Sequence, residues 1–508
     1  MEYVVEMLNI TKKFSGIKAN DDITLQVKKG EIHALLGENG AGKSTLMSVL
    51  FGIYQPEKGS IRIRGRNVRI MGPKNASDMG IGMVHQHFKL VKDFTVLENI
   101  ILGEEPATFG FIRMDDARYR VEQLSKKYNL RINPDAKISE ITVGMQQRVE
   151  ILKMLYRDNN ILIFDEPTAV LTPQEIDELM QIMKGMAKEG KSIIFITHKL
   201  NEIKAVADKC TVLRYGKYIG TLDVKESTKE EMSEMMVGRK ISFNVEKSEF
   251  KPGETILSVR NLSKNSKHGG KKILNNISFE VRKGEILSIA GIDGNGQSEL
   301  VEALTGLNPS DEGQIVLRGQ DISKKSIRYR NVNGLAHVPE DRHKHGLVLD
   351  YSLEENLILK KYFTKIFSPN GFIRKSVTRP FANQLIKDFD IRSSEGAKTK
   401  TRSMSGGNQQ KAIIAREIDT DHDVLIAVQP TRGLDVGAIE YIHNQLVKER
   451  EAGKAILLVS FEIDEVMDIS DRILVMYEGA IIADLNPKTT TVNELGMYMA
   501  GSIRSVAD

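Results

Sequence analysis

Cysteine and tryptophan are scarce: the 508 residues contain one cysteine, Cys210, and no tryptophan. A single cysteine cannot form an intrachain disulfide, which fits a reducing compartment, so we expect Cys210 to be a small core residue. Long apolar runs are also missing, because segments such as residues 161–164 and 455–459 end after four or five residues. A membrane-spanning helix needs about 20 apolar residues, and the N-terminal segment lacks the pattern of a signal peptide. We therefore expect a chain that does not cross a membrane by itself.

The chain also lacks a large excess of charge of either sign. The chain has 72 Lys and Arg against 68 Asp and Glu, a net charge of +4. This excess is too small to indicate a nucleic-acid partner, and we expect none. With 41% hydrophobic and 28% charged residues, the composition excludes collagen-like and wholly disordered chains. The length favours two to four domains.

An internal repeat organises the sequence. Gly37 in GEIHALLGENGAGKST aligns with Gly291 in GEILSIAGIDGNGQSE, and Gly59 aligns with Gly313, both 254 residues apart. Further on, VGMQQR matches GGNQQK and DEPTAVLT matches VQPTRGLD, in the same order. We predict a first domain at residues 1–238, a polar linker at 239–255 and a second domain at 256–508.

Short β-branched runs alternate with helical stretches in each copy. Residues 31–36, 161–164 and 192–197 are typical of buried parallel strands. Residues 88–155 lack such runs and are expected to be mostly helical. The fold class is therefore predicted to be α/β, with helices on both faces of a parallel sheet.

A glycine-rich segment of the first copy, GENGAGKST at residues 37–45, fits the phosphate-binding pattern G-x-x-x-x-G-K-[ST]. It follows an apolar strand and precedes an expected helix, so backbone amides and the helix N-terminus can surround phosphate oxygens. We expect Lys43 to reach the β- and γ-phosphates of ATP and Ser44 to bind Mg²⁺. The other expected ATP contacts in this segment are Gly37, Asn39, Gly40, Ala41, Gly42 and Thr45.

An acidic pair follows a hydrophobic run in the same copy. Asp165 and Glu166 come at the end of ILIF, at the sheet edge where α/β proteins bind ligands. Alone, such a pair is usually a solvated turn; beside a phosphate loop it favours catalysis. Asp165 then suits the Mg²⁺ shell, and Glu166 suits polarising the attacking water.

Together these motifs resemble those of the ATP-binding-cassette (ABC) ATPases, twice over nearly the whole chain. The resemblance implies two P-loop ATPase domains, each with a RecA-like core, a β-rich N-terminal subdomain and a helical subdomain. It implies that Phe14 stacks on adenine and that His198 contacts the γ-phosphate. It also implies that Gln86 senses Mg²⁺ and contacts the membrane partner. Residues 141–145, ITVGM, occupy the place of the family signature LSGGQ but differ from it at four of five positions.

The second copy has lost most of these groups. In register, Lys43 is replaced by Gln297, Asp165 by Val428, Glu166 by Gln429, His198 by Phe461, Phe14 by Ser266 and Gln86 by Glu340. Charge neutralisation, metal binding and water activation are lost together, so we expect no ATP hydrolysis at this loop. Its signature, MSGGN at residues 404–408, is nearly complete.

The resemblance implies that the two domains pair head to tail and form two ATP sites between them. In that arrangement the intact residues fall in one site and the altered residues in the other. One site combines the first copy's residues with the second signature and the loop after it: Ser405, Gly406, Gly407, Asn408 and Asp435. The other site combines the altered residues with ITVGM and Thr172. We therefore predict one hydrolytic site and a second interface that is regulatory or holds nucleotide.

Several segments resemble the sugar and nucleoside importers in particular: VPEDR, MSGGNQQK and QPTRGLDVGA at residues 338–342, 404–411 and 429–438. In that group the ATPase drives two transmembrane permease subunits, and an external lipoprotein binds the substrate. MVHQHF and EPTAVLTPQE favour the nucleoside branch, associated with a basic membrane lipoprotein; ribose or galactose is the alternative. The resemblance implies a peripheral location at the cytoplasmic face of the cell membrane.

Two alternative interpretations concern the whole chain and a cluster of histidines. A ribosome-bound ABC-F translation factor is also a tandem cassette, but normally has a long basic linker and two competent sites. Here the linker has about seventeen residues of mixed charge. The other is a metal site at His337, His343 and His345; without cysteine, and on a charged segment, we expect a solvated loop instead.

Overall fold

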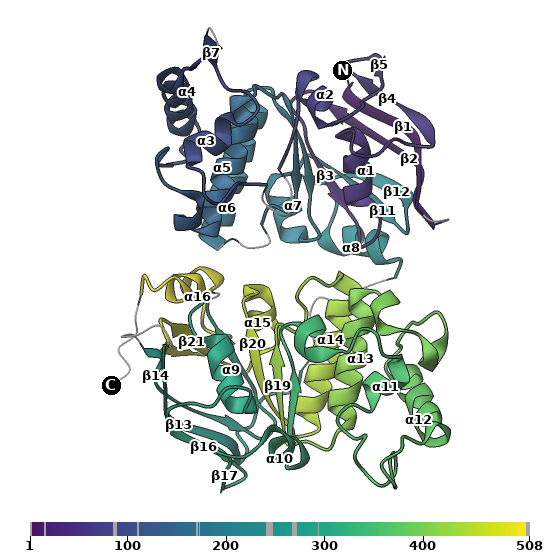
Figure 1. The fold of residues 1–508 in the computed structure, drawn as a ribbon, viewed down its shortest axis with the longest axis vertical. Helices are drawn as coiled ribbons and strands as arrows, with labels where there is room; N and C mark the ends of the chain where they lie inside the picture. The colour runs from purple at the N-terminus through teal and green to yellow at the C-terminus, as the bar shows by residue number, and fades with distance from the viewer. Residues whose placement is uncertain are drawn as a thin grey trace. The chain divides into compact units, whose positions relative to one another are not determined.

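The computed structural model describes residues 3–14, 17–84, 89–108, 111–168, 171, 173–239, 247–266, 272–292 and 294–503. The chain divides into two units, Met1–Ile241 and Ser242–Asp508, each of which is considered by itself (Figure 1). Gln86 and Thr172, which the sequence analysis singled out, lie outside the described residues.

The first unit contains an antiparallel sheet and a mostly parallel one. The antiparallel sheet consists of β1 (Tyr3–Phe14), β2 (Ile17–Lys28), β4 (Lys58–Ile63) and β5 (Arg66–Val68), in the order β2-β1-β4-β5. The second sheet consists of β3 (Ile32–Leu36), β6 (Ile81–Val84), β9 (Ile161–Asp165), β10 (Ser192–Ile196), β11 (Lys209–Arg214) and β12 (Lys217–Asp223). Its order is β12-β11-β3-β10-β9-β6, and only the β11-β12 pair is antiparallel among its described neighbours.

The helices of the first unit are α1 (Lys43–Leu50), α2 (Pro73–Asp78), α3 (Val96–Ile101), α4 (Met114–Lys127), α5 (Val143–Tyr156), α6 (Pro173–Lys188), α7 (Leu200–Val206) and α8 (Lys229–Val237), with a 3₁₀ turn at Ile138–Glu140. In Figure 1, α3, α4 and α5 lie at one end of the unit and the antiparallel strands lie at the other. Between these ends, Leu46 and Leu50 of α1 pack in one core with Val5 of β1 and Ile163 of β9.

The second unit repeats this plan. Its antiparallel sheet, in the order β14-β13-β16-β17, is built from β13 (Thr255–Asn265), β14 (Lys272–Arg282), β16 (Glu312–Leu317) and β17 (Gln320–Asp321). Its larger sheet, in the order β18-β19-β20-β15-β21-β22, is built from β15 (Ile286–Ala290), β18 (Leu335–Val338), β19 (Val424–Val428), β20 (Ala455–Ser460), β21 (Arg472–Tyr477) and β22 (Ala480–Leu485).

Its helices are α9 (Gln297–Thr305), α10 (Ile327–Val332), α11 (Leu353–Leu357), α12 (Lys375–Asp388), α13 (Gly406–Asp419), α14 (Val436–Glu451), α15 (Ile463–Ile469) and α16 (Val492–Met499). A π-helical turn lies at Arg342–Gly346, and 3₁₀ turns lie at Gly396–Lys398 and Thr401–Ser403.

Alternate residues of β19 face two different cores, because successive side chains of a strand point to opposite faces. Val424, Ile426 and Val428 belong to the core that includes α9. Leu425 and Ala427 belong to the core that includes α13 and α14. Burial on both faces is why these strands are continuous apolar runs in the sequence.

The predicted fold class is confirmed: both units are α/β, with a β-rich part and a helical part beside a parallel core. Strands β3, β9 and β10 match the three predicted runs within one residue at either end. Residues 88–155 are mainly helical but also contain a short hairpin, β7 (Ala107–Thr108) with β8 (Phe111–Ile112). Cys210 is fully buried on β11, and burial raises the pKa of its thiol to about 12.

Part of the predicted linker docks onto the second unit. The Lys247 ammonium donates to the backbone carbonyl of Ser470, and the Ser248 amide donates to Glu451 Oε1 at 3.1 Å. Strand β13 then begins at Thr255. In the portion of the chain that the structure describes, no helix is both long enough and apolar enough to span a membrane.

Candidate functional site

The glycine-rich loop of the first unit connects β3 to α1. Gly40 and Gly42 have φ of 83° and 94°, in the left-handed region that glycine adopts without strain. A Cβ at Gly42 would lie 2.2 Å from Ala19 O, so only glycine fits there. The buried side chain of Asn20 donates from Nδ2 to Gly42 O at 3.0 Å, a support that the sequence analysis missed.

Lys43 is the first residue of α1 and is folded back under this loop. Its side chain is buried, and Nζ donates to Gly37 O at 2.6 Å and to Glu38 O at 3.0 Å. The ammonium is therefore held inside the loop, where it also lowers the pKa of Asp165 and of Glu166. This is the position from which a lysine can neutralise phosphate charge.

Ser44 and Asp165 lie side by side. Ser44 Oγ donates to Asp165 Oδ1 at 3.4 Å, and Asp165 is the last residue of β9. Burial raises the pKa of Asp165 to about 6, the hydrogen bond from Ser44 lowers it in part, and the charge of Glu166 raises it further. Mg²⁺ prefers hydroxyl and carboxylate oxygens, and a buried carboxylate that lacks a cation gains from one, so these residues fit the ion.

Glu166 and His198 form the next pair. Glu166 Oε1 lies 3.3 Å from His198 Nδ1, and this contact is the main reason that the pKa of Glu166 is lowered. Glu166 therefore stays ionised next to Asp165, as a carboxylate that polarises a water must. Both residues follow parallel strands, β9 and β10, whose carboxyl ends meet at one edge of the sheet.

Phe14 ends β1 and is partly exposed. Its ring contacts Tyr54 edge to face, with the centroids 5.0 Å apart, and Lys12 Nζ lies 5.3 Å from the Phe14 centroid. An exposed aromatic pair of this kind can receive a planar base. The contact of Tyr54 with Phe14 could not be predicted from the sequence, because no motif includes Tyr54.

In the first unit, a carboxylate of helix α6 lies against the helix at the signature position, α5. Thr142 caps α5 by accepting a hydrogen bond from the Met145 amide at 3.3 Å. A Cβ at Gly144 would lie 2.1 Å from Glu175 Oε1, so this carboxylate sits against the first turn of α5. A negative charge there opposes phosphate binding, and ITVGM is thus a worse signature than its sequence alone indicated.

In the second unit, the loop equivalent to the glycine-rich loop has an uncharged Gln297 in place of the lysine. Gln297 is 2% exposed, and neither Nε2 nor Oε1 has a partner among the described residues. Ser298 Oγ donates to Glu340 Oε2 at 3.3 Å, and Arg432 Nη1 donates to Glu340 Oε1 at 2.7 Å. The carboxylate of Glu340 is already paired with an arginine there. Val428, the last residue of β19, stands in register with Asp165 and has no oxygen or nitrogen in its side chain to bind a metal.

The signature of the second unit opens α13. Ser405 is its N-cap residue and is exposed, so the first amides of the helix are accessible. Asn408 Nδ2 donates to Ser405 Oγ at 2.8 Å. Asp435 caps α14 by accepting from the Ala438 amide at 2.8 Å. A Cβ at Gly407 would meet Ala438 Cβ at 3.3 Å, where the first unit has Glu175 in register.

The prediction of a solvated loop is wrong for His337, whereas His343 and His345 are exposed in the π-helical turn Arg342–Gly346. His337 lies on β18, because the strand extends to Val338, and burial lowers the pKa of its imidazole to about 3. His343 Nε2 contacts Gln409 Oε1 at 2.9 Å from the π-helical turn. Within the described ranges, no group of three or more His, Cys, Asp or Glu side chains is placed to hold a metal.

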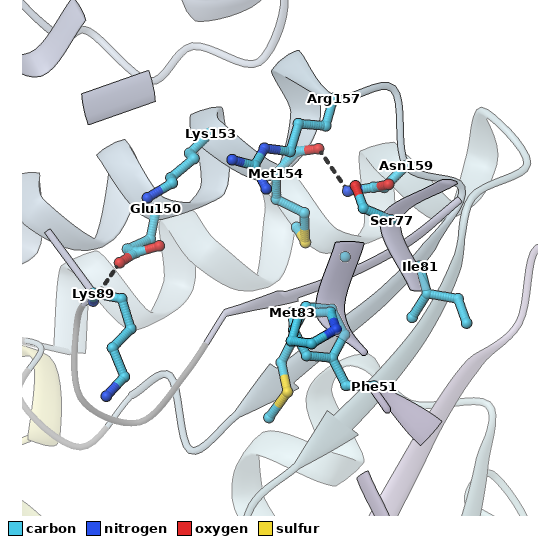
Figure 2. Close-up of a pocket in the computed structure, with 12 residues that line it drawn as sticks. Phe51, Ser77, Ile81, Met83, Lys89, Glu150, Lys153, Met154, Arg157 and Asn159 are labelled. Atoms are coloured by element: carbon cyan, nitrogen blue, oxygen red, sulfur yellow. Dashed lines mark hydrogen bonds between the residues drawn. The ribbon is translucent and has the colours of Figure 1, made fainter. Parts of the chain in front are cut away.

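A cavity of about 200 Å³ lies between α5 and β6 (Figure 2). Its apolar lining includes Phe51, Met83 and Met154. Its charged lining consists of Lys89, Glu150, Lys153 and Arg157. The Lys89 amide donates to Glu150 Oε1 at 2.6 Å, and burial raises the pKa of that carboxyl.

Comparison with known proteins agrees with this geometry. The family model described as "ABC transporter" matches residues 20–169 and 274–432, more than half of the chain. The guanosine import ATP-binding protein NupO of Bacillus subtilis (strain 168) is 57% identical over 507 residues, covering 100% of this chain and 99% of that protein. The nucleoside import ATP-binding protein NupA of Lactococcus lactis subsp. cremoris (strain MG1363) is 52% identical, covering 98% of each chain.

Among solved structures, the archaeal ribosome recycling factor aABCE1, in complex with the ribosomal stalk protein aP1, matches 94% of this chain and 90% of its own. The TM-score is 0.63 at 19% identity, a likeness that shows the tandem-cassette fold alone. The family match and the two full-length relatives agree with the phosphate loop and the acidic strand end described above. The chain belongs to the ABC transporter family and is an ATPase with two ATP-binding cassettes.

Proposed function

We propose that this chain is the ATP-hydrolysing subunit of an importer for nucleosides. The observation that carries the ATPase chemistry is the meeting of Lys43, Ser44 and Asp165 in one buried cluster, next to the Glu166–His198 pair. The substrate class comes from the names of the two relatives, which match this chain end to end at 57% and 52% identity.

The hydrolytic site is composite. The first copy, residues 1–238, supplies the phosphate loop, the acidic pair, Phe14, Gln86 and His198. The second copy, residues 256–508, supplies the five residues of its signature and following loop. The asymmetry between the two signatures supports this pairing, since Glu175 lies against the first helix and Ala438 lies at the equivalent place in the second.

Each residue of the first copy has a chemical task. Glu166 holds and polarises the attacking water, and His198 orients that carboxylate while facing the γ-phosphate. Lys43 neutralises charge on the β- and γ-phosphates. Ser44, Asp165 and Gln86 hold Mg²⁺, which when bound offsets the negative charge that develops on the transferred phosphoryl group.

The second copy does not hydrolyse ATP. Gln297 carries no charge, Val428 cannot bind a metal, and the amide of Gln429 cannot accept a proton. Glu340 adds a negative charge, but Arg432 already pairs with it at 2.7 Å. We assign a regulatory or nucleotide-holding role to this interface.

The partners are two transmembrane permease subunits, with an external substrate-binding lipoprotein acting through them. The chain then lies at the cytoplasmic face of the membrane without spanning it. The cavity between α5 and β6 fits a permease segment with apolar and acidic side chains. Its apolar wall complements such a segment, and the cations of Lys89, Lys153 and Arg157 outnumber the one carboxylate in the lining, that of Glu150.

Uptake in cells tests the proposal. Labelled nucleosides and labelled ribose are supplied to cells that lack the gene, with rescue by the wild type or by Glu166→Gln. We expect nucleoside uptake to be lost and to be restored by the wild type alone. Loss of ribose uptake alone assigns the chain to sugar import and contradicts the nucleoside assignment while leaving the site intact.

Fractionation tests the location. We expect the chain in the membrane pellet when its permeases are present and outside it when they are deleted. Recovery with ribosomes in both strains would contradict the importer and favour a translation factor.

A further inference from the structure

The side chain of Arg342 lies beside the first turn of α13, the signature helix of the second unit. A Cβ at Gly406, the first residue of α13, would lie 3.5 Å from both Cζ and Nη1 of Arg342. A Cβ at Gly433, in the loop before α14, would lie 3.5 Å from Arg342 Nη2. The guanidinium therefore sits between the signature and the loop that ends at Asp435.

This guanidinium forms no salt bridge within the described residues. In the described part of the chain it donates one hydrogen bond, from Nη2 to Arg432 O at 3.4 Å, and no carboxylate lies within salt-bridge distance. Arg342 is half-buried, and burial lowers the pKa of its guanidinium. The charge of Asp341 raises this pKa in part and that of Arg432 lowers it, and no carboxylate pairs with the guanidinium directly. A cation that is partly removed from water without a directly paired anion costs free energy, which an anionic ligand would recover.

The backbone holds Arg342 firmly in this place. It begins the π-helical turn Arg342–Gly346, which Asp341 caps by accepting from the amides of His343 and Lys344. The turn is fastened to α13, since His343 Nε2 contacts Gln409 Oε1 at 2.9 Å and Arg416 donates to Gly346 O at 2.8 Å. Such turns occur often at functional sites.

The repeat shows that the arginine belongs to one copy alone. With Gln86 aligned to Glu340, Arg342 aligns with Phe88, which has no charge. Arg342 therefore accompanies the intact signature, and in register the sequence of the first copy has no cation at this position. A residue that only held the Gln86-type loop in place would have no reason to follow this asymmetry.

We propose that Arg342 contacts the γ-phosphate of the ATP bound at the first copy's phosphate loop, as a further cation of the composite hydrolytic site. This inference rests on the head-to-tail pairing in the proposed function. Because the proposed pairing brings the signature amides to the same phosphate, the guanidinium would add a charged donor at the point where negative charge develops. ADP lacks that phosphate and gains nothing from Arg342.

The test measures nucleotide discrimination in the chain purified with its permease subunits. In a Glu166→Gln background, Arg342→Ala is expected to weaken Mg·ATP binding about tenfold and to change Mg·ADP binding less than about twofold. With Glu166 present, Arg342→Ala is expected to lower kcat at least about tenfold, and Arg342→Lys to recover part of the loss. Lys344→Ala, an exposed cation in the same turn, is the matched control and should change neither.

Two results would overturn the inference. Equal loss of ATP and ADP affinity, with a lowered melting temperature, would make Arg342 structural. Unchanged hydrolysis in Arg342→Ala would also overturn it, and Ser405→Ala then identifies the reason. If Ser405→Ala lowers hydrolysis, the composite site stands and Arg342 plays no part in it; if it does not, the pairing itself is wrong.

Discussion

Glu166 and Gln429 have the same backbone conformation, with φ of 46° at both, immediately after equivalent strands. Each amide donates to the neighbouring strand, from Glu166 to Ile196 O at 3.0 Å and from Gln429 to Val459 O at 2.8 Å. A left-handed φ in a non-glycine residue costs free energy and is kept where the surroundings enforce it. The second unit has thus kept the strand-end geometry of the first and lost its carboxylate.

Lys43→Ala is expected to reduce ATP hydrolysis by at least about 100-fold, since no other cation replaces a charge buried inside the phosphate loop. The matched variant is Gln297→Ala, at the same helix position in the second unit. It should leave hydrolysis within about twofold of the wild type. Phosphate release by the purified complex measures both, and equal losses in the two variants would contradict an unequal pair of sites.

Asp165 should make the nucleotide-free chain less stable as the pH rises from about 4 to about 6. The folded chain keeps this carboxyl protonated up to a pKa of about 6, against 3.8 ordinarily, so the unfolded chain loses the proton first. Asp165→Asn copies the neutral form and should add about 1–3 kcal/mol of stability at pH 7.5 and almost none at pH 3.5. Thermal melts without nucleotide measure this, and the same difference at both pH values would contradict it.

The two left-handed glycines of the loop should differ in their tolerance of alanine. Gly42→Ala places a methyl group 2.2 Å from Ala19 O and is expected to abolish nucleotide binding. Gly40→Ala places its methyl group more than 4 Å from every described atom outside its chain neighbours, so its main cost is the φ of 83°, about 1 kcal/mol. Nucleotide titration and a thermal melt separate the two, and similar binding by both variants would disprove the crowding.

Glu417 holds a buried ionic cluster in the second unit. It is fully buried, Arg416 Nε donates to it at 3.0 Å, and Lys360 pairs with its other oxygen. Glu417→Ala leaves two cations without a counter-charge and should cost about 3–5 kcal/mol. Asp390→Ala removes an exposed carboxylate paired with Lys411 and should cost less than about 1 kcal/mol. Denaturant unfolding measures both, and equal costs would contradict the buried cluster.

Residues that a local motif marks could be predicted from the sequence. Glycine spacing marks the phosphate loop and an apolar run marks the acidic strand end, and the structure brings Ser44 of the first within 3.4 Å of Asp165 of the second. Contacts of residues that no motif marks could not be predicted, such as that of Glu175 beside Gly144. His337 was misplaced because the apolar run LAHV is too short to mark a strand in a charged neighbourhood.

The most direct test of the account compares Glu166→Gln with Gln429→Ala in the complex with the permeases, by steady-state phosphate release. One hydrolytic site predicts that Glu166→Gln loses at least about 99% of turnover, since a general base contributes 10²–10⁴-fold. Gln429→Ala should keep turnover within about twofold of the wild type. Substantial hydrolysis in Glu166→Gln would contradict the single-site account.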